Sequence, residues 1–185
     1  WLYVGALTLT GVAAVLATIA MRWAPVGSAK QGRVIMVERH STWEPSTHPY
    51  DTKWYGHDAG YNYGAIYRYC QQFFEMSRLL ETDRIDLETL GRHDIVVLKI
   101  PTARFLPHEV DAIERFVRAG GALLLIGDHT NVFRSTTYLN DVARRFGFAF
   151  RDDLLFCVGT PYEQPYQRPW AAHPSVQQVD RMDFA

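Results

Sequence analysis

Four residues with acid–base side chains stand at two places in the 185-residue chain. Glu38 and His40 follow the apolar run RVIMV, and Asp128 and His129 follow the apolar run ALLLI. If both runs are parallel strands of one sheet, these side chains lie at its carboxyl edge, where open α/β sheets bind ligands. Imidazole and carboxylate groups placed together can transfer protons or hold a metal ion. The sequence therefore predicts a cluster of Glu38, His40, Asp128 and His129.

The turn Gly127–Asn131 has no serine or cysteine. Many α/β enzymes keep their nucleophile at such a strand-to-helix turn. In a structural interpretation, Asp128 or Thr130 caps the following helix and His129 hydrogen-bonds the first loop. We favour this interpretation over catalysis and expect the turn to be a relic of a catalytic elbow that now orders residues 38–60. Because the spacing matches no zinc pattern such as HExxH, we expect no metal and no cofactor.

The loop of residues 38–60 is long and rich in histidine and aromatic residues. Its candidate binding residues are Trp43, Trp54, Tyr55 and His57. Such a cluster can stack a sugar or bind a partner, or it can pack on itself as a lid over the sheet edge. Both interpretations stay open. Near the next helix start, Asn131 and Arg134 supply donors that could hold an anion.

The composition excludes one class of partner. The chain carries 19 basic and 20 acidic residues, for a net charge of −1, and 48% of its residues are hydrophobic. Binding to nucleic acid needs a clustered basic field, so we expect no nucleic-acid partner. The apolar share is that of a domain with a buried core.

The first 21 residues carry no charged side chain. About 20 apolar residues in a helix span a bilayer, and Trp1, Tyr3 and Trp23 flank this stretch as interfacial aromatics do. We therefore predict that residues 1–23 form a membrane anchor in the lipid bilayer. The alternatives are a buried core helix and a signal peptide. The basic residues that follow predict a cytoplasmic domain by the positive-inside rule, with the periplasm as the alternative.

The remaining pattern alternates strands and helices, which predicts a mainly parallel sheet. We expect strands at 33–37, 82–85, 94–100, 122–126 and 148–150, and helices at 61–80, 87–91, 107–119 and 136–146. The expected organisation is a transmembrane helix (1–23), a linker (24–32), an α/β domain (33–160) and an extended proline-rich segment (161–185). Because the chain does not begin with methionine, we expect it to be a segment of a longer protein.

The order of these elements, and above all FVRAGGALLLIGDHT at residues 116–130, resembles the class I glutamine amidotransferase-like superfamily. The resemblance implies a flavodoxin-like three-layer sandwich. It also implies a catalytic cysteine after the strand 122–126, where this chain has Asp128 and His129 instead. Without a sulfur nucleophile the family's glutamine hydrolysis is not expected. The chain is most similar to non-catalytic, membrane-anchored members of that group.

The sequence therefore predicts a membrane-anchored, non-catalytic binding domain that serves as an accessory subunit among other membrane protein subunits. The alternative is a hydrolase-type enzyme that uses Glu38, His40, Asp128 and His129, with or without a metal ion.

Overall fold

The computed structural model describes residues 2–21, 31–43, 45–48, 63–128, 130–152, 164–167 and 181–184. The described helices are α1 (Leu2–Met21), α2 (Tyr63–Cys70), α3 (Leu87–Leu90), α4 (Pro107–Arg118) and α5 (Ser135–Ala143), with single 3-10 turns at Val132–Arg134 and Arg144–Phe146. The described strands are β1 (Arg33–Val37), β2 (Glu75–Leu79), β3 (Ile95–Lys99), β4 (Ala122–Ile126), β5 (Gln164–Gln167) and β6 (Arg181–Phe184).

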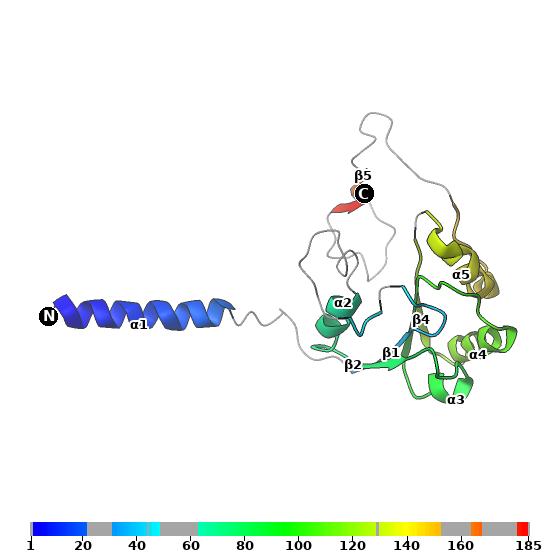
Figure 1. Ribbon diagram of the computed structural model, residues 1–185, viewed down its shortest axis with the longest axis horizontal. Coiled ribbons are helices and arrows are strands. Elements are labelled where there is room, and N and C mark those ends of the chain that lie inside the picture. Colours follow the sequence, from blue (N-terminus) through cyan, green and yellow to red (C-terminus); the bar gives the residue numbers. More distant parts are fainter. Residues whose placement is uncertain are drawn as a thin grey trace.

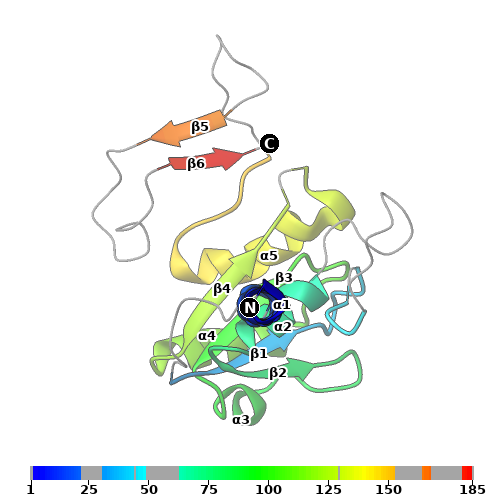
Figure 2. The same ribbon diagram turned by 90° about the vertical axis from the view of Figure 1, so that its left-hand side faces the viewer.

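Four of these strands form one parallel sheet in the order β2-β1-β3-β4. Helix α2 lies on one face of this sheet and α3, α4 and α5 lie on the other (Figure 1). The expected α/β class with a parallel sheet is confirmed. β5 and β6 pair antiparallel in a second, two-stranded sheet, which is drawn apart from the first in Figure 2.

Side chains of the central strands alternate between two cores, as the two-residue period of a strand requires. Ile35 and Val37 join the large core under α3, α4 and α5. Val34 and Met36 join the smaller core under α2. Because both faces of β1 and β3 are covered, their sequences are almost continuously apolar.

Strand β4 is less buried than its apolar run ALLLI suggests. It is an edge strand within the described sheet, and Leu124 is 51% exposed. The side chains of Leu123 and Leu125 pack against the large core, whereas Leu124 lies on the opposite face. The apolar run alone does not separate a central strand from an edge strand that is covered on one face.

The predicted helix at 61–80 is wrong in its second half. Helix α2 ends at Cys70, and after a turn the chain enters strand β2, which pairs with β1 from Arg33–Glu75 to Val37–Leu79. The short apolar repeat of this segment fits a helix or a strand, and pairing with β1 decides the outcome. The strands expected at 82–85 and 148–150 are not formed; those residues lie in turns and irregular backbone.

Several of the predicted elements are confirmed. Strands β1, β3 and β4 and helix α3 lie where the pattern placed them. Helix α4 begins at Pro107 and is followed by Gly120, whose φ of 103° suits only glycine. Asp94 joins the starts of β1 and β3, because its carboxylate accepts hydrogen bonds from the backbone N–H and the guanidinium of Arg33. These hydrogen bonds lower the pKa of Asp94 to about 2.

Helix α1 covers most of the segment predicted to be an anchor, and its side chains from Tyr3 to Thr18 are exposed. Its threonines donate hydrogen bonds to carbonyl oxygens one turn earlier, as Thr8 does to Val4 at 2.9 Å. This pairing satisfies the hydroxyl groups within the helix itself. Over the part of the chain that the structure describes, no helix meets the length and apolarity needed to cross a membrane.

Candidate functional site

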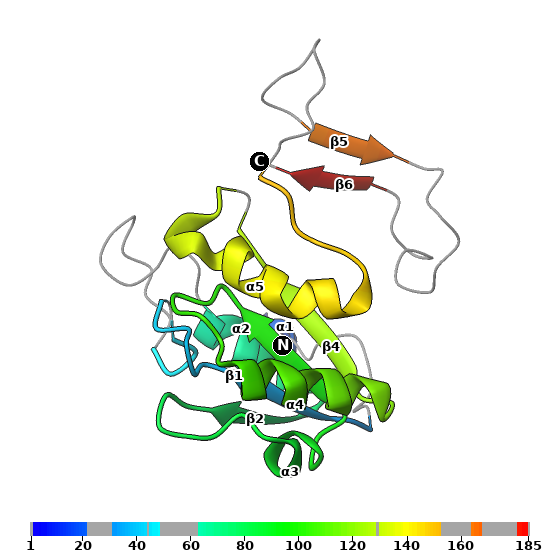
Figure 3. The ribbon, with the colours of Figure 1, turned by 90° about the vertical axis from the view of Figure 1, so that its right-hand side faces the viewer.

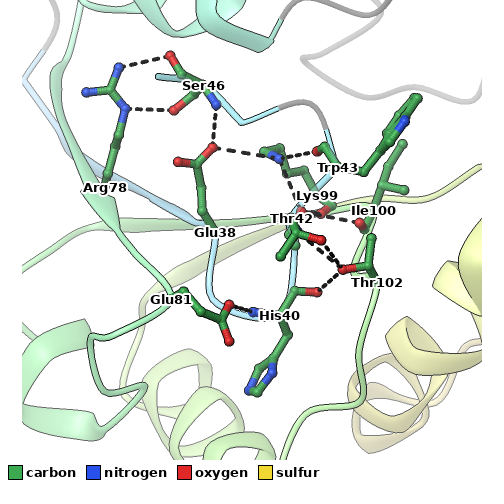
Figure 4. Close-up of polar contacts among 11 residues, drawn as sticks. Glu38, His40, Thr42, Trp43, Ser46, Arg78, Glu81, Lys99, Ile100 and Thr102 are labelled. Atoms are coloured by element: carbon green, nitrogen blue, oxygen red, sulfur yellow. Dashed lines mark hydrogen bonds and ion pairs between the residues drawn. The ribbon is translucent and has the colours of Figure 1, made fainter. Parts of the chain in front are cut away.

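A buried ion pair lies just beyond β1 and at the end of β3. Lys99, the last residue of β3, is fully buried, and its Nζ lies 3.7 Å from Oε1 of Glu38. The same Glu38 oxygen accepts a hydrogen bond of 2.5 Å from the backbone N–H of Ser46. The Lys99 ammonium also lies 4.8 Å from the ring centre of Tyr63 in α2. Glu38 is therefore held by the protein on two sides (Figure 4).

The first residues of the loop after β1 are joined to the segment after β3. Ser41 Oγ accepts a hydrogen bond from Lys99 Nζ and donates one of 2.6 Å to the Lys99 carbonyl oxygen. Lys99 Nζ also donates to the Trp43 carbonyl oxygen at 3.1 Å. The backbone N–H of Thr102 donates to the His40 carbonyl oxygen at 2.6 Å. These contacts tie the loop after β1 to the segment after β3, with Glu38, His40 and Ser41 buried.

His40 belongs to a different cluster, next to the first turn of α4. Its Nε2 lies 2.7 Å from Oε2 of Glu109, which is almost fully buried in the first turn of α4. Arg39 Nε donates to the other carboxylate oxygen of Glu109, Oε1, at 2.7 Å. The Leu106 backbone N–H donates to Oε2 at 2.8 Å. Burial alone raises the pKa of Glu109, but these hydrogen bonds outweigh it and lower the pKa below its usual value.

The Glu38 and His40 side chains point away from each other (Figure 4). We expected them to face one crevice. Strand β1 ends at Val37, His40 takes a φ of 66°, and its ring faces Glu109 and packs against the Phe105 ring at an interplanar angle of 83°. The structure therefore does not bring these two candidate acid–base residues together.

The turn after β4 is held by its own side chains. The Asp128 carboxylate accepts hydrogen bonds from the Thr130 backbone N–H and hydroxyl and, at 3.3 Å, from the Val132 N–H. Asn131 Oδ1 accepts from the backbone N–H groups of Thr136 and Thr137 and so caps α5. These bonds pair two backbone donors at the start of α5, and the Asn131 amide itself donates to Thr137 Oγ1 and to the Asp152 carboxylate.

This turn is not a sharp elbow. Eight residues, 127–134, separate the end of β4 from the start of α5. In a nucleophile elbow the strand turns sharply into the helix, with the nucleophile on the strained turn between them. The longer connection includes a 3-10 turn and three residues with left-handed backbone, Asn131, Phe133 and Arg134.

Strain gathers at the carboxyl edge of the sheet. The described non-glycine residues with positive φ are His40, Ile100, Asn131, Phe133 and Arg134, which follow β1, β3 and β4. For a β-branched residue such as Ile100, with φ of 30°, this backbone is unusual. Backbone strain of this kind persists where surrounding contacts enforce it, most often in functional regions.

An aromatic contact joins the two loops of this edge. The rings of Trp43, from the loop after β1, and Phe133, from the turn after β4, have centroids 5.8 Å apart. Phe133 is 46% exposed despite its left-handed backbone. The neighbouring guanidinium of Arg134 lies 5.9 Å from the Tyr138 ring centre. Of the predicted binding residues, Trp43 and Arg134 therefore lie on loops that share this edge.

Some predicted site residues lie outside the described part of the chain: Trp54, Tyr55, His57 and His129. Among the residues that the structure does describe, no group of three or more histidine, cysteine or acidic side chains is placed to hold a metal ion.

Sequence reasoning missed the residues that organise the edge: Lys99, Ser41, Arg39 and Glu109. A signal existed for Lys99, because a lone lysine at the end of the apolar run IVVLK must find a buried partner. Glu109 stands in the first turn of a helix that starts with Pro107. An acidic residue at that place is common, because its charge interacts favourably with the helix dipole. Its tertiary contact with His40, 69 positions away, leaves no local pattern.

Comparison with known proteins adds one relative. The chain is 33% identical over 76 residues to an "Uncharacterized protein" of Aquifex aeolicus (strain VF5), which covers 40% of this chain and 32% of that protein. The chain thus matches about a third of the length of this curated relative. No protein-family model matches the chain.

Proposed function

We propose that this chain is a membrane-anchored, non-catalytic binding domain that acts as an accessory subunit of a larger membrane protein assembly. The proposal includes a flavodoxin-like, amidotransferase-like sandwich for the α/β unit. One observation carries it: the described acid–base candidates of the carboxyl edge are engaged by the protein itself. Glu38 is held by Lys99 and Ser46, His40 by Glu109, and Asp128 by its own turn.

The hydrolase alternative has less support at this edge. A general base needs a free lone pair within hydrogen-bond reach of a nucleophile or water. Separate partners hold Glu38 and His40 on opposite sides of the first loop. These contacts give Glu38 and His40 a structural role, in which both side chains hold the strained loop 38–43 in place.

The binding surface we propose is the aromatic contact of Trp43 and Phe133 with the neighbouring Arg134. Aromatic and arginine side chains dominate the binding energy of protein interfaces. Phe133 and its neighbour Arg134 both have left-handed backbone, and the Phe133 side chain is 46% exposed. The partner we propose is another membrane protein subunit.

Co-purification tests this surface. The tagged full chain, extracted in mild detergent, should retain a partner in a constant ratio, and Phe133→Ala should lower that ratio at least about fivefold. Phe148→Ala is the matched control, because Phe148 is also an exposed phenylalanine but follows α5 instead of lying in the turn after β4. Equal capture by both variants would remove Phe133 from the binding surface.

The anchor is the second part of the proposal. It is supported by the absence of charge in residues 1–21 and by the exposed apolar side chains of α1, among them Leu7, Leu9 and Val12. A lysine near a bilayer centre costs about 2.5–3.5 kcal/mol. Leu9→Lys with Val12→Lys should move the chain from the alkali-washed membrane fraction to the supernatant, while Leu9→Ile should not. A wild-type chain already in the supernatant would contradict the anchor.

A further inference from the structure

A serine and a histidine pair lies away from the carboxyl edge, between β2 and α3. Ser77 Oγ, in the middle of β2, lies 2.8 Å from Nε2 of His93, which follows α3. The other ring nitrogen, Nδ1, lies 3.0 Å from the carbonyl oxygen of Thr89. Helix α3 lies beside β2 at the end of the sheet (Figures 2 and 3).

The contact with Thr89 determines which nitrogen of the neutral ring carries the proton. A carbonyl oxygen only accepts hydrogen bonds, so Nδ1 is the protonated nitrogen. Nε2 then presents its lone pair to the Ser77 hydroxyl. Ser77 Oγ also lies 3.3 Å from the Val34 carbonyl oxygen, but the contact with His93 is 0.5 Å shorter by these two distances. This is the arrangement of a nucleophile, a base and a group that orients the base.

The pair opens on a cavity of about 500 Å³, which is large enough for a small molecule. Ser77 and His93 are both half-buried and both line it. Arg84 lines the same cavity, and among the described residues its guanidinium makes no hydrogen bond or ion pair. Two lining carboxylates are already used as caps, Asp83 for the Leu80 N–H and Asp86 for the Thr89 N–H.

We propose that Ser77 and His93 form a nucleophile–base pair that cleaves small carboxylic esters carrying a negative charge. Three arginines, Arg78, Arg84 and Arg92, line the cavity against two carboxylates, Asp83 and Asp86, and this excess of positive charge favours an anionic substrate. This site is separate from the carboxyl edge, to which the non-catalytic role of the proposed function applies, and it goes beyond that function.

In the first step Ser77 Oγ bonds to the acyl carbon while its proton passes to His93 Nε2. The bond from the acyl carbon to the alcohol oxygen breaks, and the alcohol takes that proton. Water then attacks the acyl carbon and gives a proton to Nε2, and the Ser77 oxygen leaves and takes it back. One ester and one water become one acid and one alcohol, and the pair is restored.

An alkyl fluorophosphonate probe tests the pair on the detergent-purified full chain. An activated serine displaces fluoride from the probe and keeps the phosphonate, which mass spectrometry of the digested chain locates. We expect the adduct on Ser77, no adduct in Ser77→Ala, and labelling at least about 100-fold slower in His93→Gln because the base is lost. Ser135→Ala is the control, since its Oγ is buried and unbonded within the described residues, and it should label as the wild type does.

The position of the adduct on the wild-type chain tests whether Ser77 is the nucleophile, even if a variant fails to fold. A wild-type chain that stays unlabelled would overturn the proposal and leave Ser77 and His93 as a structural tie between β2 and α3. An adduct on another serine, or wild-type labelling rates in a folded His93→Gln, would overturn it as well. Far-UV circular dichroism reports whether each variant is folded.

Discussion

At the scale of single residues, the carboxyl edge is organised by buried charges. Lys99 and Glu109 are almost fully buried, and each faces side chains of the first loop, Glu38 in one case and Arg39 with His40 in the other. Candidate residues such as Glu38 and His40 were visible in the sequence because they follow a strand. Their partners were not, because the pairing spans 61 to 70 positions and depends on the folded sheet.

Replacement of both members of the buried pair should cost less stability than the two single replacements added together. Glu38→Gln leaves the Lys99 ammonium buried without its carboxylate, which costs about 3–5 kcal/mol of unfolding free energy. Glu38→Gln with Lys99→Met removes both charges, so the cost of the double variant should fall clearly below the sum of the single costs. Urea unfolding of the full chain in mild detergent measures this, and additive costs would show that the two side chains do not interact.

Glu109 should make the fold sensitive to acid. Its pKa is lower in the folded chain than the usual value of about 4.3 for a glutamate, so its stabilising contribution is present above that value. The contribution is lost as the pH falls through the lower, folded pKa. Unfolding measured from pH 7 to pH 3 should therefore show a smaller acid loss in Glu109→Gln than in the wild type.

The comparison for this experiment is Glu88→Gln, which removes an exposed i,i+4 pair with Arg92. Exposed pairs contribute little, so this variant should keep the wild-type acid dependence. An acid dependence that is the same in all three proteins would show that Glu109 does not control it.

At the scale of elements, predictions held where one signal dominated and failed where two competed. Pro107 marks the start of α4 and the Gly-Gly pair follows its end. The apolar run IVVLK was predicted as a strand and forms β3. The segment after Cys70 was mistaken for helix because apolar spacing is ambiguous over a few residues, and only the pairing of β2 with β1 made it a strand. The turn after β4 was expected to be the relic of an elbow, but eight residues with a 3-10 turn separate β4 from α5, and the Asn131 side chain caps α5 through the Thr136 N–H.

The junction of α4 and β4 has no room for a side chain at Gly121. A Cβ added there would lie 2.2 Å from Cζ of Phe116, a buried ring of the large core. Gly121→Ala should therefore destabilise the chain by about 1–3 kcal/mol through overpacking. Gly32→Ala is the control, because its Cβ would meet Phe74 at an ordinary 3.4 Å. Equal melting temperatures for the two variants would contradict this packing.

At the scale of the whole molecule, the described sheet has its polar cluster at the carboxyl ends of the strands, and part of the edge strand β4 is exposed. The edge is strained, internally hydrogen-bonded and joined across two loops by Trp43 and Phe133. Strain together with occupied acid–base groups favours recognition over catalysis at this edge. The α/β class followed from the alternation of elements, whereas the partner of a binding surface has no signature in one sequence.

Native mass spectrometry of the detergent-extracted full chain tests the central claim most directly. We expect a complex in which the chain is bound to a second membrane protein in a constant, whole-number ratio. The Phe133→Ala variant should release the free chain of 21.2 kDa. A wild-type chain that appears only as a free monomer, together with an esterase or amidase activity that Glu38→Gln or His40→Gln abolishes, would contradict it.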